Sequence, residues 1–368
     1  SDVPDRPLSG RAELRGNSVN QERSGMFRLD GVSGGNVVLH VDGLVRNGDD
    51  YRIPGYAIDP HALDADGHDD HADLEGELGP RGRLENSSTR TRAGGVGATW
   101  LGDKAFLGAS LSTYRSNYGI PNGAHVHADD DHGHDHDDHD HAEEEGGEHD
   151  VRIDMVQNRF ELKGGLYNPT SFLKSLTVRG GYTDYEHTEL EAGTPSTRFT
   201  NKGFEGRVEA VQQPLAGWDG AFGVQFGSSD FGAIGEEAFV PGTTTDTIGA
   251  FVLQEKQFGP FKLELGARHD QVKLDPNDAQ RSRSFGATNL SASGIWALND
   301  TFDLRFGVDA SERAPTNEEL YAAGAHIATR SLEIGNANMD TERGRRMELG
   351  LHAHNERIEV QEAIYQTK

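Results

Sequence analysis

The stretch "FKLELGARHD" (residues 261–270) alternates apolar and polar side chains with a period of two. The apolar positions, which share one face of an extended chain, are Phe261, Leu263, Leu265 and Ala267. The same alternation returns in "TFDLRFGVDA" (residues 301–310) and in "RMELGLHAH" (residues 346–354). A run of about ten residues is the length at which a tilted β-strand crosses a membrane, although a soluble β-sandwich would show the same pattern.

The connections between such stretches separate the two architectures. Short turns are expected near Gly102–Asp103, Gly259–Pro260 and Asn299–Asp300. Long connections are expected at 52–80, 119–150, 188–197, 232–245, 273–282 and 311–341. Short turns at one end and long loops at the other are typical of an outer-membrane barrel. The sequence therefore predicts an all-β fold, a transmembrane antiparallel β-barrel of about fifteen strands with long extracellular loops.

Composition sets further bounds. The chain has 368 residues, a formal net charge of −26, 47 glycines and no cysteine. Without cysteine there is no disulfide framework and no thiolate metal site. The acidity argues against a nucleic-acid partner and favours cations. The opening residues, "SDVPDRPLSG", are polar and do not form a signal peptide.

Residues 313–340, "RAPTNEELYAAGAHIATRSLEIGNANMD", carry a family resemblance. Their "RAP…EELY" and "GNANM" pieces resemble two sequence boxes late in the barrels of TonB-dependent outer-membrane receptors. The opening "GRAELRGNSVNQERSGMFRLDG" and "DYRIPGYA" are similar to the first barrel strands of that family. Together with the histidine-rich stretch at residues 125–141, these pieces resemble the zinc-uptake branch of the family.

The resemblance implies a location and a partner. Receptors of this family sit in the outer membrane of Gram-negative bacteria, have barrels of 22 strands, and couple to the TonB energy-coupling complex through a plug. We expect residues 1–368 to form part of such a barrel, with the plug and the coupling motif outside this chain. Outer-membrane lipid would surround it.

The stretch "HVHADDDHGHDHDDHDH" (residues 125–141) offers imidazoles and carboxylates, which are ligands for Zn²⁺ and also for Cu²⁺ and Ni²⁺. Twelve acidic residues lie between Asp129 and Asp150. A solvated acidic loop would explain those residues but not the repeated histidines. We therefore predict many overlapping weak metal sites in this loop, with the candidate ligands His125, His127, His132, His134, His136, His139, His141 and His149.

A second cluster, "DPHALDADGHDDHADLEGE" (residues 59–77), lies in the first long loop. Its candidate ligands are His61, His68 and His71. The calcium-loop spacing of an EF-hand is not met there. His326, between the two family boxes, is a candidate for one tighter site together with Glu333; the alternative is a loop histidine without a special role. His352 and His354 fall on the polar phase of a strand and are expected to line the lumen.

These patterns favour a receptor that imports zinc, with Zn²⁺ as the transported ligand and no catalytic cofactor. A haem, copper or nickel receptor of the same family is the alternative, and a secreted metal-buffering protein is the alternative from another class. No nucleophile elbow, P-loop or HExxH motif appears in the sequence, so we do not expect an enzyme.

Overall fold

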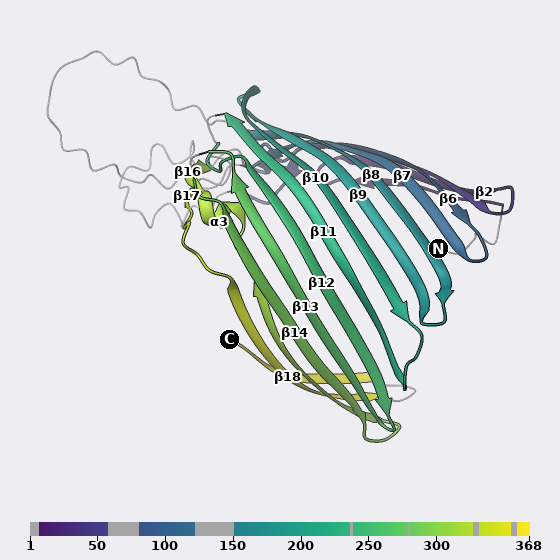
Figure 1. Cartoon of the computed structure of the whole chain (residues 1–368). Coiled ribbons are helices and arrows are strands. Elements are labelled where there is room, and N and C mark those ends of the chain that lie inside the picture. The colour runs from purple at the N-terminus through teal and green to yellow at the C-terminus, as the bar shows by residue number, and fades with distance from the viewer. Residues whose placement is uncertain are drawn as a thin grey trace, which may run out of the picture.

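The computed structural model describes residues 7–57, 81–121, 151–235, 238–278, 280–326, 331–354 and 359–368. A single antiparallel sheet of fifteen strands dominates it, and the strand order follows the chain (Figure 1). Its strands are β1 (Leu8–Asn17), β2 (Glu22–Ser33), β3 (Val37–Gly48), β6 (Thr89–Leu101), β7 (Ala105–Ile120), β8 (Val151–Thr170), β9 (Leu173–Glu191), β10 (Thr194–Gln212), β11 (Trp218–Gly235), β12 (Thr243–Phe258), β13 (Phe261–Pro276), β14 (Arg283–Ala297), β15 (Phe302–Arg313), β18 (Glu342–His354) and β19 (Glu359–Thr367). The prediction of an all-β fold with about fifteen strands is confirmed.

Five short elements of the described residues lie outside this sheet. Strand β4 (Tyr51–Arg52) pairs with β5 (Arg83–Leu84), and β16 (Ala323–His326) pairs with β17 (Ser331–Ile334). Helix α3 (Asn317–Tyr321) begins with a capping box in which Thr316 and Glu319 bond each other's backbone N–H groups. In the part of the chain that the structure describes, no helix is long and apolar enough to cross a membrane.

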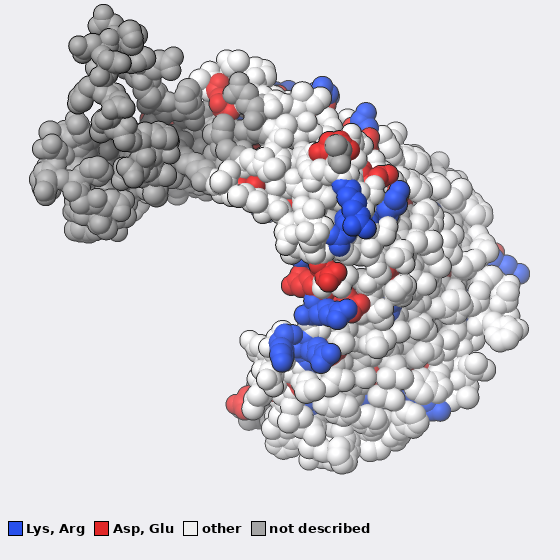
Figure 2. Space-filling model, turned by 60° about the vertical axis from the view of Figure 1, so that its left-hand side comes forward, with Lys and Arg blue, Asp and Glu red and all other residues white. Residues whose placement is uncertain are grey.

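The sheet curves into an open trough whose concave face carries charged side chains (Figure 2). In strand β13 the outward positions are Phe261, Leu263, Leu265 and Ala267, and the inward positions are Lys262, Glu264 and Arg268. Large apolar side chains such as Phe160, Val224 and Leu265 are exposed on the convex face. The strand phase expected for residues 261–268 is therefore the one the sheet adopts.

The outward apolar positions form a belt that covers only part of the long strands. In β9, which has 19 residues, Leu176, Val178 and Tyr182 lie in the belt. The next outward positions are Asp184, Glu186 and Thr188. Strand β13 changes in the same way, from Ala267 to His269. Since a membrane strand needs only about 9–11 residues, the wall β8–β13 rises beyond the lipid at the end with the long connections.

One expected loop is absent. Residues 188–197 were predicted to be a long connection, but β9 and β10 continue to a two-residue turn at Ala192–Gly193. Both turn residues have positive φ, 48° and 80°, as a type I′ hairpin turn requires. The prediction was wrong because the outward residues are polar above the belt, which hides the strand alternation.

Candidate ligand path on the lumen face

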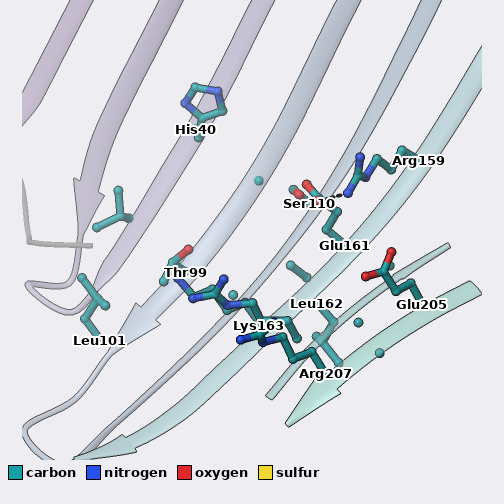
Figure 3. A pocket seen from close by; sticks show the side chains of 18 of the residues that line it. His40, Thr99, Leu101, Ser110, Arg159, Glu161, Leu162, Lys163, Glu205 and Arg207 are labelled. Atoms are coloured by element: carbon teal, nitrogen blue, oxygen red, sulfur yellow. Dashed lines mark ion pairs between the residues drawn. The ribbon is translucent and has the colours of Figure 1, made fainter. Parts of the chain in front are cut away.

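The concave face of β1–β3 and β6–β11 lines a hollow of about 940 Å³ (Figure 3). Five cations line it: Arg28, Arg159, Lys163, Arg179 and Arg207. Three carboxylates line it as well: Asp30, Glu161 and Glu205. The strand register explains this arrangement, because alternate residues of each strand point to the same face and neighbouring strands pair in register. The lumen wall here is charged and open rather than apolar and packed.

Several of these charges pair with one another. Arg159 Nη2 lies 2.9 Å from Glu161 Oε1. Arg207 Nη2 lies 2.6 Å from Glu209 Oε2, and its guanidinium stacks 4.2 Å from the ring centre of Phe251. Exposed pairs of this kind are worth about 0–1 kcal/mol each. They orient the side chains more than they stabilise the sheet.

His40 on β3 belongs to the same wall. Its Nδ1 lies 2.8 Å from Asp30 Oδ1, and its Nε2 lies 2.7 Å from Asp42 Oδ1. Both ring nitrogens are therefore engaged by carboxylates on opposite sides of the ring. This arrangement does not direct three ligand atoms at one point.

Nearer the mouth, His187 on β9 sits against aromatic rings. It stacks on Phe199 with ring centroids 4.6 Å apart, and its Nδ1 lies 3.0 Å from the Tyr185 hydroxyl. Its Nε2 is 3.9 Å from Glu189 Oε1, and Glu189 is only 3% exposed. Sequence reasoning missed His187 because the chain just after it was predicted to be a loop.

Hydrogen bonds of Asn86, which we call the tie at Asn86, join the described ends of the two histidine-rich connections, 53–82 and 121–150. The Asn86 amide donates to the carbonyls of Ile120 and Val151, at 2.8 and 2.7 Å, where β7 ends and β8 begins. The Arg152 guanidinium donates to Asn86 Oδ1 and Ser88 Oγ, both at 3.1 Å. Asn86 is 7% exposed and has a positive φ of 53°. Ile120 and Val151, which flank residues 121–150, therefore lie beside Asn86, which follows the connection 53–82.

The base of the first segment is closed by Asp50. Its carboxylate accepts from Arg83 Nη2 at 2.6 Å and from the backbone N–H groups of Ser87 and Ser88. The pairing of β4 with β5 holds Tyr51 opposite Leu84 at the same place. These contacts fix both ends of the connection to the rim of the sheet.

The connection between β15 and β18 folds over the lumen face instead of projecting away. Leu320 and Tyr321 of α3 are buried against Leu274 and Phe285 of the wall. The Tyr321 hydroxyl donates to the Arg281 carbonyl at 2.9 Å. Burial raises the pKa of the Tyr321 hydroxyl. This segment is a packed unit rather than a solvated loop.

Glu319 anchors that unit by charge. Both of its carboxylate oxygens accept from the Arg313 guanidinium at 2.9 Å, and one also accepts from Thr316 N–H at 2.8 Å. The Arg313 hydrogen bonds, followed by the Thr316 N–H, lower the pKa of Glu319 to about 2. The carboxylate therefore stays ionised across the range of natural conditions.

The sequence-derived metal ligands fall into two groups. His61, His68 and His71, and the eight histidines from His125 to His149, lie outside the described residues. His326 and Glu333 lie on the β16–β17 hairpin, where the backbone pairs His326 with Ser331 and Glu333 with Gly324. No group of three His, Asp or Glu side chains is arranged to hold a metal ion within the described ranges.

His352 lines the lumen, as the strand phase predicts. Its Nδ1 lies 3.4 Å from Asp303 Oδ2, and its Nε2 lies 3.0 Å from Glu359 Oε1. Position 354 shares this phase on β18. These contacts join β15, β18 and β19 at the end of the sheet that has the short turns.

Comparison with known proteins identifies the family. Residues 35–368 match the family model "TonB dependent receptor-like, beta-barrel". The chain belongs to this family. TonB-dependent receptors are outer-membrane transport proteins of Gram-negative bacteria, not enzymes, so the predicted location is confirmed and a secreted buffering protein is excluded.

Solved structures share the fold of this TonB-dependent receptor chain. The copper transporter OprC matches with a TM-score of 0.69 at 14% identity, covering 97% of this chain and 53% of that one. The hemophore receptor HasR of Serratia marcescens, in complex with HasA and heme, matches with 0.72 at 14%, covering 99% and 55%. The FrpB iron transporter of Neisseria meningitidis matches with 0.65 at 13%, covering 98% and 53%. The chain thus spans about half the length of these structures.

Proposed function

We propose that this TonB-dependent receptor chain serves the import of zinc across the outer membrane. Histidine and aspartate side chains of 52–80 and 119–150 would capture ions, and a tighter site with His326 and Glu333 would hold an ion before transport. Energy would come from the TonB complex through the plug that the family resemblance implies. Surrounding outer-membrane lipid and zinc ions are the other partners.

The observation that carries this proposal is the tie at Asn86. It joins the described residues that flank the two segments richest in histidine, 52–80 and 119–150, at one side of the mouth. Segments rooted side by side raise the local concentration of ligands for the same ion. Their acidic residues raise the local concentration of cations as well. A solvated acidic loop without metal binding would explain neither the repeated histidines nor the neighbouring attachment points of the two segments.

The alternatives are other metal cargoes. Imidazole and carboxylate ligands bind Cu²⁺ more tightly than Zn²⁺ in general, and one similar fold is that of a copper transporter. Another similar fold is that of a hemophore receptor solved in complex with its hemophore and heme. Competition between Zn²⁺, Cu²⁺ and haem for one receptor preparation separates these possibilities.

The test is zinc titration calorimetry on the full-length receptor in detergent, with and without residues Ala124–Gly147. The deletion should leave the barrel folded and remove several weakly bound ions, because seven histidines between 125 and 141 are lost. A matched variant changes only those histidines to glutamine and keeps both the loop length and the acidic charge. Equal zinc binding by the wild type and the glutamine variant would refute capture by histidine.

Growth of a strain with the deletion, measured across a chelator series, tests the transport step. Uptake should suffer when zinc is scarce and recover when zinc is plentiful, since the deletion removes capture and spares the tighter site. Loss of uptake at every zinc level would make the loop the primary site instead.

A further inference from the structure

Two arginines lie directly opposite each other on the outer, convex face of the sheet, on the neighbouring strands β6 and β7 (Figure 1). Arg92 pairs in register with Arg115, and both side chains are exposed. They share the outward phase of Val96 and Leu111, whereas alternate residues such as Ser110 line the lumen hollow. Like charges at directly opposite positions destabilise an antiparallel pair, so an anion bound between them would offset that cost.

The neighbours of this pair on the outer face do not neutralise it. Val45 and Val156 flank the pair on β3 and β8. The next outward residue of β6 toward the long connections is a third exposed cation, Arg90. Asp154 lies diagonal to Arg115, and no ion pair joins the two in the described part of the chain. The strands on both sides of the pair belong to this chain, so these contacts do not depend on the rest of a barrel.

The height of the pair places it at the boundary of the lipid. Trp100 is exposed on the same face of β6, near the short-turn end and eight positions from Arg92. At about 3.4 Å per residue and a tilt of about 40°, this spacing corresponds to ~20 Å of height, against an apolar band of ~25 Å. Tryptophan is typical of the interface that bounds such a band. The arginines therefore reach the lipid headgroups on the side of the long connections.

The outer face is hollowed next to the pair. A cavity of about 380 Å³ is lined by Phe27, Gly43 and Gly94 as well as by the two arginines. Gly43 lies opposite Gly94, and a Cβ atom at Gly43 would come within 2.6 Å of the Phe27 ring. A Cβ atom at Gly94 would meet only a backbone oxygen, at 3.4 Å, so the space above Gly94 is open. An apolar hollow beside two cations at this height matches an acyl chain that ends in a phosphate.

We propose that this surface is a binding site for a phosphorylated membrane lipid. One acyl chain lies in the hollow at Gly94, and the phosphate is held between the guanidinium groups of Arg92 and Arg115, with Arg90 above them. A guanidinium presents a planar fork of donors that matches phosphate oxygens. Clusters of cations beside the hydrocarbon layer attract anionic lipids. This site on the outer face goes beyond zinc capture by the loops and does not depend on it.

The test titrates the full-length receptor, in an uncharged detergent, with dimyristoyl phosphatidic acid, and native mass spectrometry counts the bound lipid. Phosphatidylcholine with the same chains is the headgroup control. A double variant, Arg92→Gln with Arg115→Gln, removes both cations, and Gly94→Val fills the hollow without a change of charge. Lys202→Gln is the matched control, because Lys202 lies on the same outer face between two aspartates of β9 and β11.

Phosphatidic acid should bind the wild type more tightly than phosphatidylcholine does. Each arginine beside an anionic headgroup changes the affinity about fivefold, so the double variant should bind phosphatidic acid about 25-fold more weakly and lose the preference for it. Gly94→Val should weaken the binding of both lipids, because the space for the chain is filled. Lys202→Gln should bind both lipids as the wild type does.

Three results would overturn the proposal. The first is binding of phosphatidic acid that is equal in the wild type and the double variant, or that falls as far in Lys202→Gln, because the pair would then not hold the phosphate. The second is unchanged binding by Gly94→Val, because the chain would then lie elsewhere. The third is displacement of the lipid by inorganic phosphate at equal concentration, because the site would then serve a free anion.

Discussion

Replacing Leu263 by arginine should destabilise the receptor by about 2–4 kcal/mol, the cost of a lipid-facing arginine near the middle of a barrel wall. The outward apolar run of β13 extends from Phe261 to Ala267. Its centre falls at residue 264, so Leu263 lies about one residue, or ~3 Å, from the middle of the belt. Almost the whole midplane cost therefore applies. Equilibrium unfolding in guanidinium with phospholipid vesicles measures it.

Two controls on the same strand isolate the effect of lipid. Gln271→Arg places the same charge on the same face but above the belt; it removes one hydrogen bond to the Phe285 carbonyl, worth about 1 kcal/mol. Lys262→Leu, on the lumen face, removes ion pairs with Glu255 and Glu264 at 2.9 and 2.7 Å, worth at most about 1 kcal/mol each at this exposure. If Leu263→Arg cost no more than Gln271→Arg, the apolar run would not face lipid.

Three further changes give distinct readouts. Gly119→Ala should lower the denaturant midpoint by the equivalent of about 1–3 kcal/mol, because the new methyl group would overlap Asn86 and weaken its hydrogen bonds. An unchanged midpoint would mean that Asn86 can move aside without loss of stability. Glu319→Gln should cost up to about 1 kcal/mol at pH 6, and the difference from the wild type should vanish as pH falls toward 2. The folded pKa of Glu319, about 2, lies below its unfolded value of about 4.3, so the stabilisation by its carboxylate is complete above pH 4.3 and is lost on acidification. Urea titrations at pH 6 and pH 3 would contradict this if the difference in unfolding free energy between the wild type and Glu319→Gln stayed constant. His326→Ala should weaken the tightest zinc step while leaving the number of weakly bound ions nearly unchanged, and calorimetry that showed only weak sites lost would argue against a tight site on the β16–β17 hairpin.

The strand pattern was readable from the sequence wherever lipid imposes it. In the belt, every second residue of a strand such as β13 must be apolar, and "FKLELGARHD" shows that rule directly. Above the belt both faces meet water, and the alternation disappears. The hairpin at Ala192–Gly193 was missed for this reason, since "DYEHTELEAGTP" reads as a polar loop.

The lumen features could be predicted only in part. The polar phase of β18 predicted a lumen position for His352, because phase depends on one strand alone. The positions of Lys163, Arg179 and Arg207 depend on three strands at once, and "ELKGG", "TVRGG" and "FEGRV" give no sign that their cations lie opposite one another. Register is set by strand pairing across turns of different lengths. The tie at Asn86 was hidden for a similar reason, since it joins residues 65 positions apart.

The height of the wall β8–β13 separates two sets of anionic groups that compete for divalent cations: the ligands of the receptor at its rim and the phosphates of the lipid surface. Strand β9, with 19 residues, reaches ~48 Å along the barrel axis at a tilt of about 40°, and the apolar band of such barrels is ~25 Å tall. The rim therefore stands on the order of 20 Å above the hydrocarbon boundary. At physiological ionic strength the Debye length is about 8 Å, so the phosphates of the lipid surface are screened at the rim. A divalent ion arriving there meets the receptor's own ligands with little competition from the membrane on which the receptor stands.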